Sequence, residues 1–171
     1  MSKKSNIILI GMPGVGKSSA GVILAKLLGY EFVDTDLIIQ KIEGKLLKEI
    51  IAENGADGFI QIENKICSEL KPESSVVATG GSVVYGEDAM RNFKEIGTVV
   101  YLRQNIVRLK ERLDDIHNRG VVLKEGQTFE DLFNERSVLY EKYADIIVDQ
   151  NDMNLEQTLT KLVEDIEGLD I

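Results

Sequence analysis

The sequence predicts a three-layer α/β/α fold in which helices cover both faces of a five-stranded parallel sheet. Short runs rich in β-branched residues alternate along the chain with longer segments of helical periodicity, as in successive βαβ units. Most of the short runs are apolar throughout, as expected of parallel strands that are buried on both faces. The strands are predicted at residues 6–10, 31–33, 75–78, 98–102 and 146–148.

The first strand leads through a glycine-containing turn into a helix that is predicted to end near Gly29, a common type of helix C-cap. In this helix an i, i+3, i+4, i+7 stripe is expected to pack on the sheet. The stripe consists of Ala20, Ile23, Leu24 and Leu27. Further helices are predicted at residues 36–43, 46–70, 87–96, 105–114, 128–143 and 155–166. Residues 116–127 contain two glycines and no periodicity, and structureless loops of about 12 residues are often lids.

Length and composition limit the architecture and the class of partner. A chain of 171 residues with 43% hydrophobic residues is long enough for a substantial core, so residues 1–171 are expected to form a single domain. The formal net charge of -9 disfavours nucleic acid and anionic membranes, which select basic surfaces. No apolar run approaches the roughly 18 residues of a membrane span, and the N-terminus does not resemble a secretion leader. We therefore expect a soluble, cytoplasmic protein without a nucleic-acid or membrane partner. We also expect a monomer.

Cysteine and histidine each occur once. Cys67 can form no intrachain disulfide, and we expect it to be an apolar residue on the same helical stripe as Ile66 and Leu70. His117 lies among charged residues and is expected in a solvated loop rather than at a metal.

Residues 11–18, GMPGVGKS, match the phosphate-binding P-loop pattern of glycine, four residues, then Gly-Lys-Ser/Thr. The motif lies between an apolar strand and an amphipathic helix, where its mechanism requires it. Glycines let backbone N–H groups turn toward phosphates, Lys17 reaches the β- and γ-phosphates, and Ser18 offers a hydroxyl to Mg²⁺. The predicted nucleotide-binding residues of the loop are Gly14, Val15, Gly16, Lys17, Ser18 and Ser19. The motif predicts an enzyme that transfers phosphoryl groups with ATP and Mg²⁺.

Asp34 and Asp36 follow the second predicted strand, at the edge of the sheet where open α/β folds bind ligands. Because alternate side chains of an extended segment share a face, both carboxylates could approach the γ-phosphate, one toward the metal and one toward the acceptor hydroxyl. The alternative is structural, since an aspartate just before Leu37 would also suit a helix N-cap.

The third predicted strand ends in residues 79–81, TGG, whose glycines would let a ligand approach the backbone closely. A tight strand-to-helix turn has the same pattern. Phosphoryl transfer needs positioned cations, and Arg119 in the loop could deliver one when substrates bind. By contrast, Arg103, Arg108 and Lys110 are expected to form a solvated charged face.

Together these motifs resemble the shikimate kinase family, and the resemblance runs from Asn6 to Asp145. The motifs that carry it are the P-loop, Asp34-Thr35-Asp36, Gly58-Phe59 followed by Glu63, Ala78-Thr79-Gly80-Gly81, Arg119, Glu135-Arg136, Leu139-Tyr140 and Ala144-Asp145. The resemblance implies a P-loop kinase fold with a helical substrate-binding region near residues 36–70 and a lid near 115–127. It also implies ATP-dependent phosphorylation of shikimate to shikimate 3-phosphate.

The resemblance assigns catalytic and metal roles to matching positions of this chain. Lys17 and Arg119 would contact the transferring phosphate, and Asp36 would accept the hydroxyl proton or orient the hydroxyl. Ser18 and Asp34 would organise Mg²⁺.

It also assigns binding roles. Arg112 would stack on adenine, and Arg119 would close over the nucleotide. Gly80 and Gly81 would contact the substrate through the backbone, while Arg136 would bind its carboxylate.

Three positions depart from the family pattern, and all three concern substrate binding or closure. Ile60 stands where the family has a second carboxylate-binding arginine, Ser82 replaces the third glycine of a Gly-Gly-Gly motif, and Gly120 replaces a proline after the lid arginine.

Three other functions are weighed against shikimate phosphorylation. A kinase of the same fold could act on another small hydroxylated metabolite, such as a hydroxy amino acid or a sugar acid. A nucleoside monophosphate kinase is disfavoured, because residues 36–70 contain no arginine to hold an acceptor phosphate. A non-catalytic nucleotide switch would not need both Asp34 and Asp36.

Overall fold

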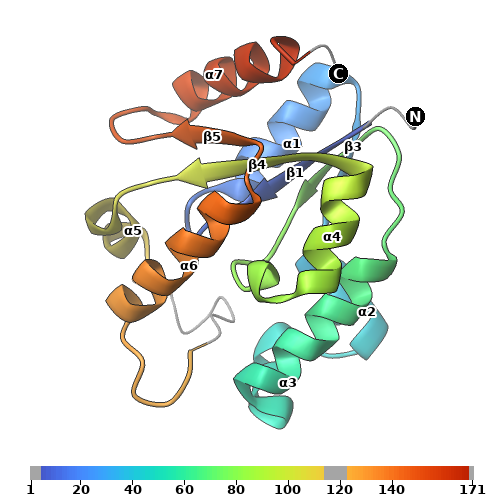
Figure 1. Cartoon of the computed structure of the whole chain (residues 1–171), viewed down its shortest axis with the longest axis vertical. Coiled ribbons are helices and arrows are strands. Elements are labelled where there is room, and N and C mark those ends of the chain that lie inside the picture. Colours follow the sequence, from blue (N-terminus) through green and yellow to red (C-terminus); the bar gives the residue numbers. More distant parts are fainter. Residues whose placement is uncertain (1–4, 114–122, 170–171) are drawn as a thin grey trace.

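The computed structural model describes residues 5–113 and 123–169, and its centre is a five-stranded sheet (Figure 1). Neighbouring strands are parallel and lie in the order β2-β3-β1-β4-β5. The strands are β1 (Asn6–Ile10), β2 (Glu31–Asp34), β3 (Ser75–Ala78), β4 (Gly97–Arg103) and β5 (Ile146–Asp149). The helices are α1 (Lys17–Leu28), α2 (Thr35–Glu43), α3 (Leu47–Glu69), the 3₁₀ helix η1 (Val83–Tyr85), α4 (Glu87–Ile96), α5 (Ile106–Arg112), α6 (Phe129–Tyr143) and α7 (Leu155–Glu167). The predicted fold class is confirmed.

The three central strands are buried along almost their whole length, which explains why their sequences are continuous apolar runs. Strand β1 is aligned with both neighbours, so that Ile8 lies opposite Val77 of β3 and Val99 of β4. The edge strands β2 and β5 are more exposed, and each runs one residue beyond its predicted end.

Helices cover both faces of the sheet (Figure 1). On one face α1 packs against α7, and on the other α4 and α6 contact β4 while α3 packs on α4. All seven predicted helices are present, but η1 was not predicted. It lies against α3, α4 and α6, close to the end of β3.

The predicted packing stripe of α1 is wrong at two positions, because Ile23 and Leu27 are exposed. The buried face is instead formed by Lys17, Ala20, Gly21, Leu24 and Ala25. At Gly21 a Cβ atom would lie 2.8 Å from the ring of Phe32, so the glycine lets α1 lie close to β2. Gly29 caps the helix in the left-handed conformation, as predicted.

Helix α3 was predicted to be continuous, but it is kinked at Gly55, which has a positive φ of 71°. Beyond the kink, Phe59 and Cys67 are buried, and the prediction that Cys67 is an apolar core residue is confirmed. Helices α2 and α3 enclose an apolar group that we call the α2–α3 cluster. It consists of Ile39, Leu47, Ile50, Phe59 and Ile66.

Within residues 5–113 and 123–169, no helix has the length and apolar character needed to cross a bilayer. His117 and most of the predicted loop 116–127 lie outside the described residues.

Candidate active site

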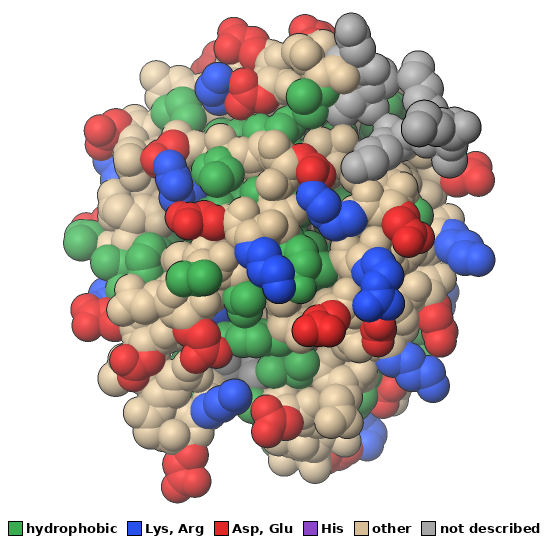
Figure 2. Space-filling model, viewed as in Figure 1, with side chains coloured by type: hydrophobic (Ala, Val, Ile, Leu, Met, Phe, Trp, Pro, Cys, Tyr) green, Lys and Arg blue, Asp and Glu red, His purple; other side chains and the backbone are tan. Residues whose placement is uncertain are grey.

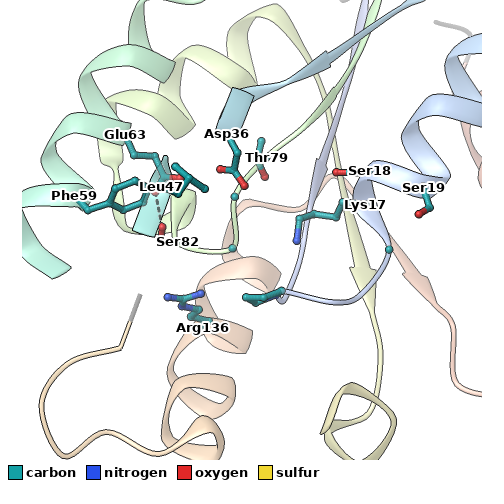
Figure 3. A pocket seen from close by; sticks show the side chains of 14 residues that line it. Lys17, Ser18, Ser19, Asp36, Leu47, Phe59, Glu63, Thr79, Ser82 and Arg136 are labelled. Carbon is teal, nitrogen blue, oxygen red and sulfur yellow. Dashed lines mark hydrogen bonds between the residues drawn. The ribbon is translucent and has the colours of Figure 1, made fainter. Parts of the chain in front are cut away.

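The carboxyl ends of three neighbouring strands meet at one cavity, shown in Figure 3. The P-loop follows β1, Asp34 ends β2, and Thr79 follows β3. The cavity has a volume of about 410 Å³. It is lined by Pro13, Gly16, Lys17, Ser18, Ser19, Asp36, Leu47, Phe59, Glu63, Thr79, Gly80, Gly81, Ser82 and Arg136. Residues far apart in the sequence thus share one site because β2, β3 and β1 are adjacent.

The P-loop backbone adopts a shape that only glycine takes readily. Gly11, Gly14 and Gly16 all have positive φ, and a Cβ atom at Gly11 would lie 2.7 Å from the carbonyl oxygen of Leu102. Gly16 is the N-cap of α1 and makes no side-chain hydrogen bond, so the first N–H groups of the helix are left for a ligand. This arrangement suits an anion such as a phosphate.

Lys17 is buried at the start of α1, and its ammonium group is held by the P-loop itself. Its Nζ atom donates to the carbonyl oxygens of Gly11 at 2.6 Å and Met12 at 2.9 Å. Burial lowers the pKa of Lys17 to about 8, against the opposing effect of the Asp36 carboxylate. The two hydrogen-bond acceptors of Lys17 are uncharged carbonyl oxygens. A phosphate would form a stronger, charge-assisted hydrogen bond with the same ammonium group.

Asp34 fits both interpretations that its sequence left open. Its Oδ1 atom caps α2 by accepting from the backbone N–H groups of Asp36 at 2.9 Å and Leu37 at 3.4 Å. Its other oxygen, Oδ2, accepts from the Ser18 hydroxyl at 3.3 Å.

The Ser18 and Asp34 oxygens are of the hard type that Mg²⁺ prefers, so this pair fits the metal. Among the described residues there is no group of three or more His, Cys, Asp or Glu that could hold a metal ion alone. The remaining ligands would therefore come from nucleotide phosphates and water, as is usual for Mg²⁺.

Asp36 lines the cavity from the first turn of α2. The predicted extended segment that contains both Asp34 and Asp36 is wrong, because α2 already begins at Thr35. The carboxylates nevertheless remain close. Burial, and then the neighbouring Asp34 charge, raise the pKa of Asp36 to about 6. A carboxylate with a pKa near neutrality is well matched to accepting a proton from a hydroxyl.

Gly80 and Gly81 are needed because side chains approach their backbone. A Cβ atom at Gly80 would lie 2.8 Å from both Asp36 Oδ1 and Glu63 Oε2. At Gly81 it would lie 2.7 Å from Pro13 Cδ and 2.9 Å from Arg136 Nη1. Gly80 and Gly81 thus form one wall of the cavity. The acidic groups of Asp36 and Glu63 lie against Gly80, and the guanidinium of Arg136 lies against Gly81.

Arg136 points into the cavity from α6 and is only 1% exposed. Its guanidinium carbon lies 5.4 Å from the centre of the Tyr85 ring, a cation–π arrangement. From the next turn of α6, the Tyr140 hydroxyl donates to the carbonyl oxygen of Gly81 at 2.6 Å. Tyr140 thus holds the backbone of Gly81 in place next to the guanidinium of Arg136.

Glu63 and Ser82 also line the cavity. In the sequence, Glu63 belongs to a family motif and Ser82 departs from one, but neither is assigned a role there. Glu63 is 1% exposed, and the Ser82 hydroxyl donates to its Oε1 atom at 2.6 Å. Burial raises the pKa of Glu63 to about 7, while the Ser82 hydrogen bond opposes this increase. An acidic residue one turn from Phe59 and one turn before Cys67, both on the buried face, is a pattern that could have indicated it.

A second cavity, of about 400 Å³, lies on the other side of the P-loop. Gly16 and Ser19 line both cavities, and Gly14 and Val15 line this one. Arg112 also lines it, as does Met153. The Nη1 atom of Arg112 lies 3.4 Å from the carbonyl oxygen of Val15, a long and weak contact. Arg119 lies outside the described residues.

Arg103, Arg108 and Lys110 have partly exposed side chains, in keeping with the expected solvated charged face, and each also forms an ion pair. Arg103 pairs with Asp149 at 2.9 Å, and Lys110 pairs with Glu130 at 2.6 Å. Arg108 pairs with the exposed Asp152. Such pairs contribute little to stability.

We expect Glu63→Gln to stabilise the protein increasingly as the pH rises from 4.5 to about 7. In this range the Glu63 carboxyl of the native protein keeps a proton that the unfolded chain has released. The contribution of Glu63 to the free energy of unfolding of the wild-type protein therefore falls as the pH rises. Glutamine does not titrate and still offers an oxygen to Ser82. Melting temperatures of both proteins across this range measure the effect, with Glu69→Gln on the exposed side of α3 as the control. A difference in melting temperature that does not change with pH would contradict the expectation.

Comparisons with known proteins agree with this geometry. A family model described as shikimate kinase matches residues 13–167. A shikimate kinase of Thermodesulfovibrio yellowstonii is 35% identical over 167 residues, covering 96% of each chain, and one of Histophilus somni is 33% identical with both chains covered completely. Among solved structures, a shikimate kinase from Acinetobacter baumannii in complex with shikimate superposes with a TM-score of 0.87 at 30% identity. That match covers 98% of this chain and 95% of the other.

Proposed function

Because this chain belongs to the shikimate kinase family, we propose that it uses the two cavities beside its P-loop to transfer the γ-phosphoryl group of ATP to a hydroxyl of shikimate. Enzymes of this family are small-molecule kinases that use ATP and Mg²⁺, and the chain is a kinase of that class. One observation carries the assignment of the acceptor site: a single cavity contains both the Asp36 carboxylate and the Arg136 guanidinium. A hydroxylated carboxylic acid has complementary groups for both.

The proposed roles follow from the positions of the side chains. The acceptor carboxylate binds Arg136, which directs a hydroxyl toward Asp36 over Gly80. Asp36 orients this hydroxyl and accepts its proton as the oxygen attacks the γ-phosphorus, and the bond from the γ-phosphorus to the bridging oxygen breaks to release ADP. Lys17 leaves the carbonyl oxygens of Gly11 and Met12 and neutralises negative charge on the transferring group.

The nucleotide is proposed to extend across the P-loop from one cavity to the other. Its phosphates bind the N–H groups around Gly16, and its base lies in the second cavity, where Arg112 stacks on adenine. Ser18 and Asp34 would hold Mg²⁺, which would supply positive charge to the phosphates of the nucleotide.

We also propose how the chain is divided into functional regions. Residues 1–171 form one P-loop kinase domain, residues 36–70 form its acceptor-binding region, and residues 115–127 form a lid that brings Arg119 to the phosphates. We propose a cytoplasmic monomer without a nucleic-acid partner. The net charge of -9 supports the last of these, because nucleic acid selects a basic surface. Size-exclusion chromatography coupled to light scattering tests the monomer.

An acceptor screen with coupled detection of ADP tests the proposed function. With ATP and Mg²⁺ present, shikimate should give a higher kcat/KM than hydroxy amino acids and sugar acids of similar size. A higher kcat/KM for one of those acceptors would contradict the assignment.

Ile60 gives a second test of the acceptor. It is half-buried against the α2–α3 cluster, so its side chain serves packing. We expect Ile60→Arg to lower the KM for shikimate or leave it unchanged. A second charge-assisted contact can strengthen binding by about 10- to 100-fold, but the lost packing offsets part of this. Ile60→Met is the control for packing. Poor wild-type use of shikimate, together with lower activity of Ile60→Arg on an acceptor carrying an ammonium group, would show that the natural acceptor is an amino-containing hydroxy acid.

A further inference from the structure

Glu63 uses only one of its two carboxylate oxygens in the described structure. Its Oε1 atom accepts from Ser82 at 2.6 Å, while Oε2 is buried and accepts no hydrogen bond from the described residues. Buried acceptors are normally satisfied, because leaving one without a donor is costly. Since Glu63 lines the acceptor cavity, the missing donor is expected from a ligand.

The position of this oxygen identifies the part of the ligand that would reach it. Glu63 Oε2 and Asp36 Oδ1 each lie 2.8 Å from the point where a Cβ atom would stand on Gly80. Asp36 Oδ1 and Glu63 Oε2 therefore lie no farther from each other than twice 2.8 Å. Two hydroxyls on adjacent carbons of one ring can each reach one of these oxygens. Figure 3 shows both side chains at the cavity, with Ser82 bonded to Glu63.

The charges around the cavity determine how the ligand must be oriented. Arg136 approaches Gly81, whereas Asp36 and Glu63 approach Gly80. An acceptor with its carboxylate at Arg136 therefore presents hydroxyls, and not its carboxylate, to the two acidic side chains.

Resting on the function proposed above, we infer that Ser82 is a positioning residue that turns Glu63 Oε2 toward the acceptor. There Oε2 binds the hydroxyl next to the one that is phosphorylated. The side chain of Ile60 packs against the α2–α3 cluster and has no polar group, so it provides no donor for Glu63. The Ser82 hydroxyl provides one instead. Glu63 and Ser82 together thus select acceptors that carry two adjacent hydroxyls.

Steady-state kinetics at pH 8, above the pKa of about 7 at which burial leaves Glu63, test the inference on its ionised form. The acceptors are shikimate and its analogue lacking that adjacent hydroxyl. The wild-type enzyme should prefer shikimate in kcat/KM by about 10-fold or more, as expected for a hydrogen bond to a carboxylate. Ser82→Ala and Glu63→Met should each reduce this preference several-fold and raise the KM for shikimate more than they lower kcat. The KM for ATP should stay unchanged, and Ser82→Thr, which keeps the hydroxyl, should restore the preference.

Ser75→Ala is the matched control. Ser75 is buried at the start of β3, outside the cavity, and its hydroxyl donates to the carbonyl oxygen of Glu73 at 2.9 Å. This variant should lose stability without changing the preference between acceptors. Ser82→Gly, which has the family's residue, replaces Ser82→Ala if the alanine variant does not fold.

The two possible failures can be told apart. Normal turnover of shikimate with an unchanged preference in the Ser82 and Glu63 variants would overturn this inference alone. Absence of shikimate turnover by the folded wild-type enzyme would overturn the proposed function and this inference with it.

Discussion

Lys17→Ala should lower kcat/KM by about 100-fold or more while the protein still folds. The substitution removes the cation that neutralises the transferring phosphoryl group. It removes no apolar core volume, and the two hydrogen bonds that Lys17 donates to Gly11 and Met12 are lost together with the cost of burying its charge. Steady-state rates and melting temperatures of the same preparation separate catalysis from folding.

Lys26→Ala is the control, because Lys26 is an exposed residue on the same helix and far from the cavity. It should keep wild-type kinetics. Near-normal turnover by Lys17→Ala would show that the P-loop lysine has no catalytic role in this chain.

Asp36→Asn should lower kcat by about 100- to 10,000-fold, the range typical of a lost general base. The KM for ATP should change little, because Asp36 faces the acceptor hydroxyl rather than the nucleotide. The pKa of Asp36 is raised to about 6, so wild-type kcat/KM should fall as the pH drops through that value. The residual activity of the variant should lack this decrease. A pH–rate profile of both enzymes measures the two effects together.

Asp34→Asn separates the metal role from helix capping, since asparagine is as good an N-cap as aspartate. It should leave the melting temperature almost unchanged and raise the Mg²⁺ concentration needed for half-maximal activity. Small, equal effects of Asp34→Asn and Asp36→Asn on catalysis would favour the purely structural role of this pair.

Much of the fold could be predicted because its strands are buried on both faces. Residues 6–10 and 75–78 contain continuous apolar runs, and the structure has strands with these same limits. The prediction of which face of α1 is buried was wrong, because hydrophobicity alone favours Ile23 and Leu27 over Lys17 and Gly21. A buried lysine and a helical glycine are explained only by the neighbouring P-loop and Phe32, contacts that periodicity does not encode.

The site could be predicted where one short motif contains the chemistry, as in the P-loop and Asp34–Asp36. The structure brings Lys17, Asp36 and Arg136 to one cavity, although they come from three separate segments. The pair of Glu63 and Ser82 could not be predicted from either residue alone, because the contact joins α3 to the turn after β3. The Arg119 assignment stays a prediction, since that residue lies outside the described part of the chain.

The reaction proposed for this chain is the phosphorylation of a hydroxyl of shikimate. The most direct measurement is ³¹P NMR of a reaction containing the folded enzyme, ATP, Mg²⁺ and millimolar shikimate. We predict that the γ-phosphate signal of ATP disappears while ADP and a phosphate-ester signal appear in equal amounts, and that neither forms when shikimate is omitted. Release of ADP with inorganic phosphate only, or no reaction by an enzyme that binds ATP, would show that shikimate is not its acceptor.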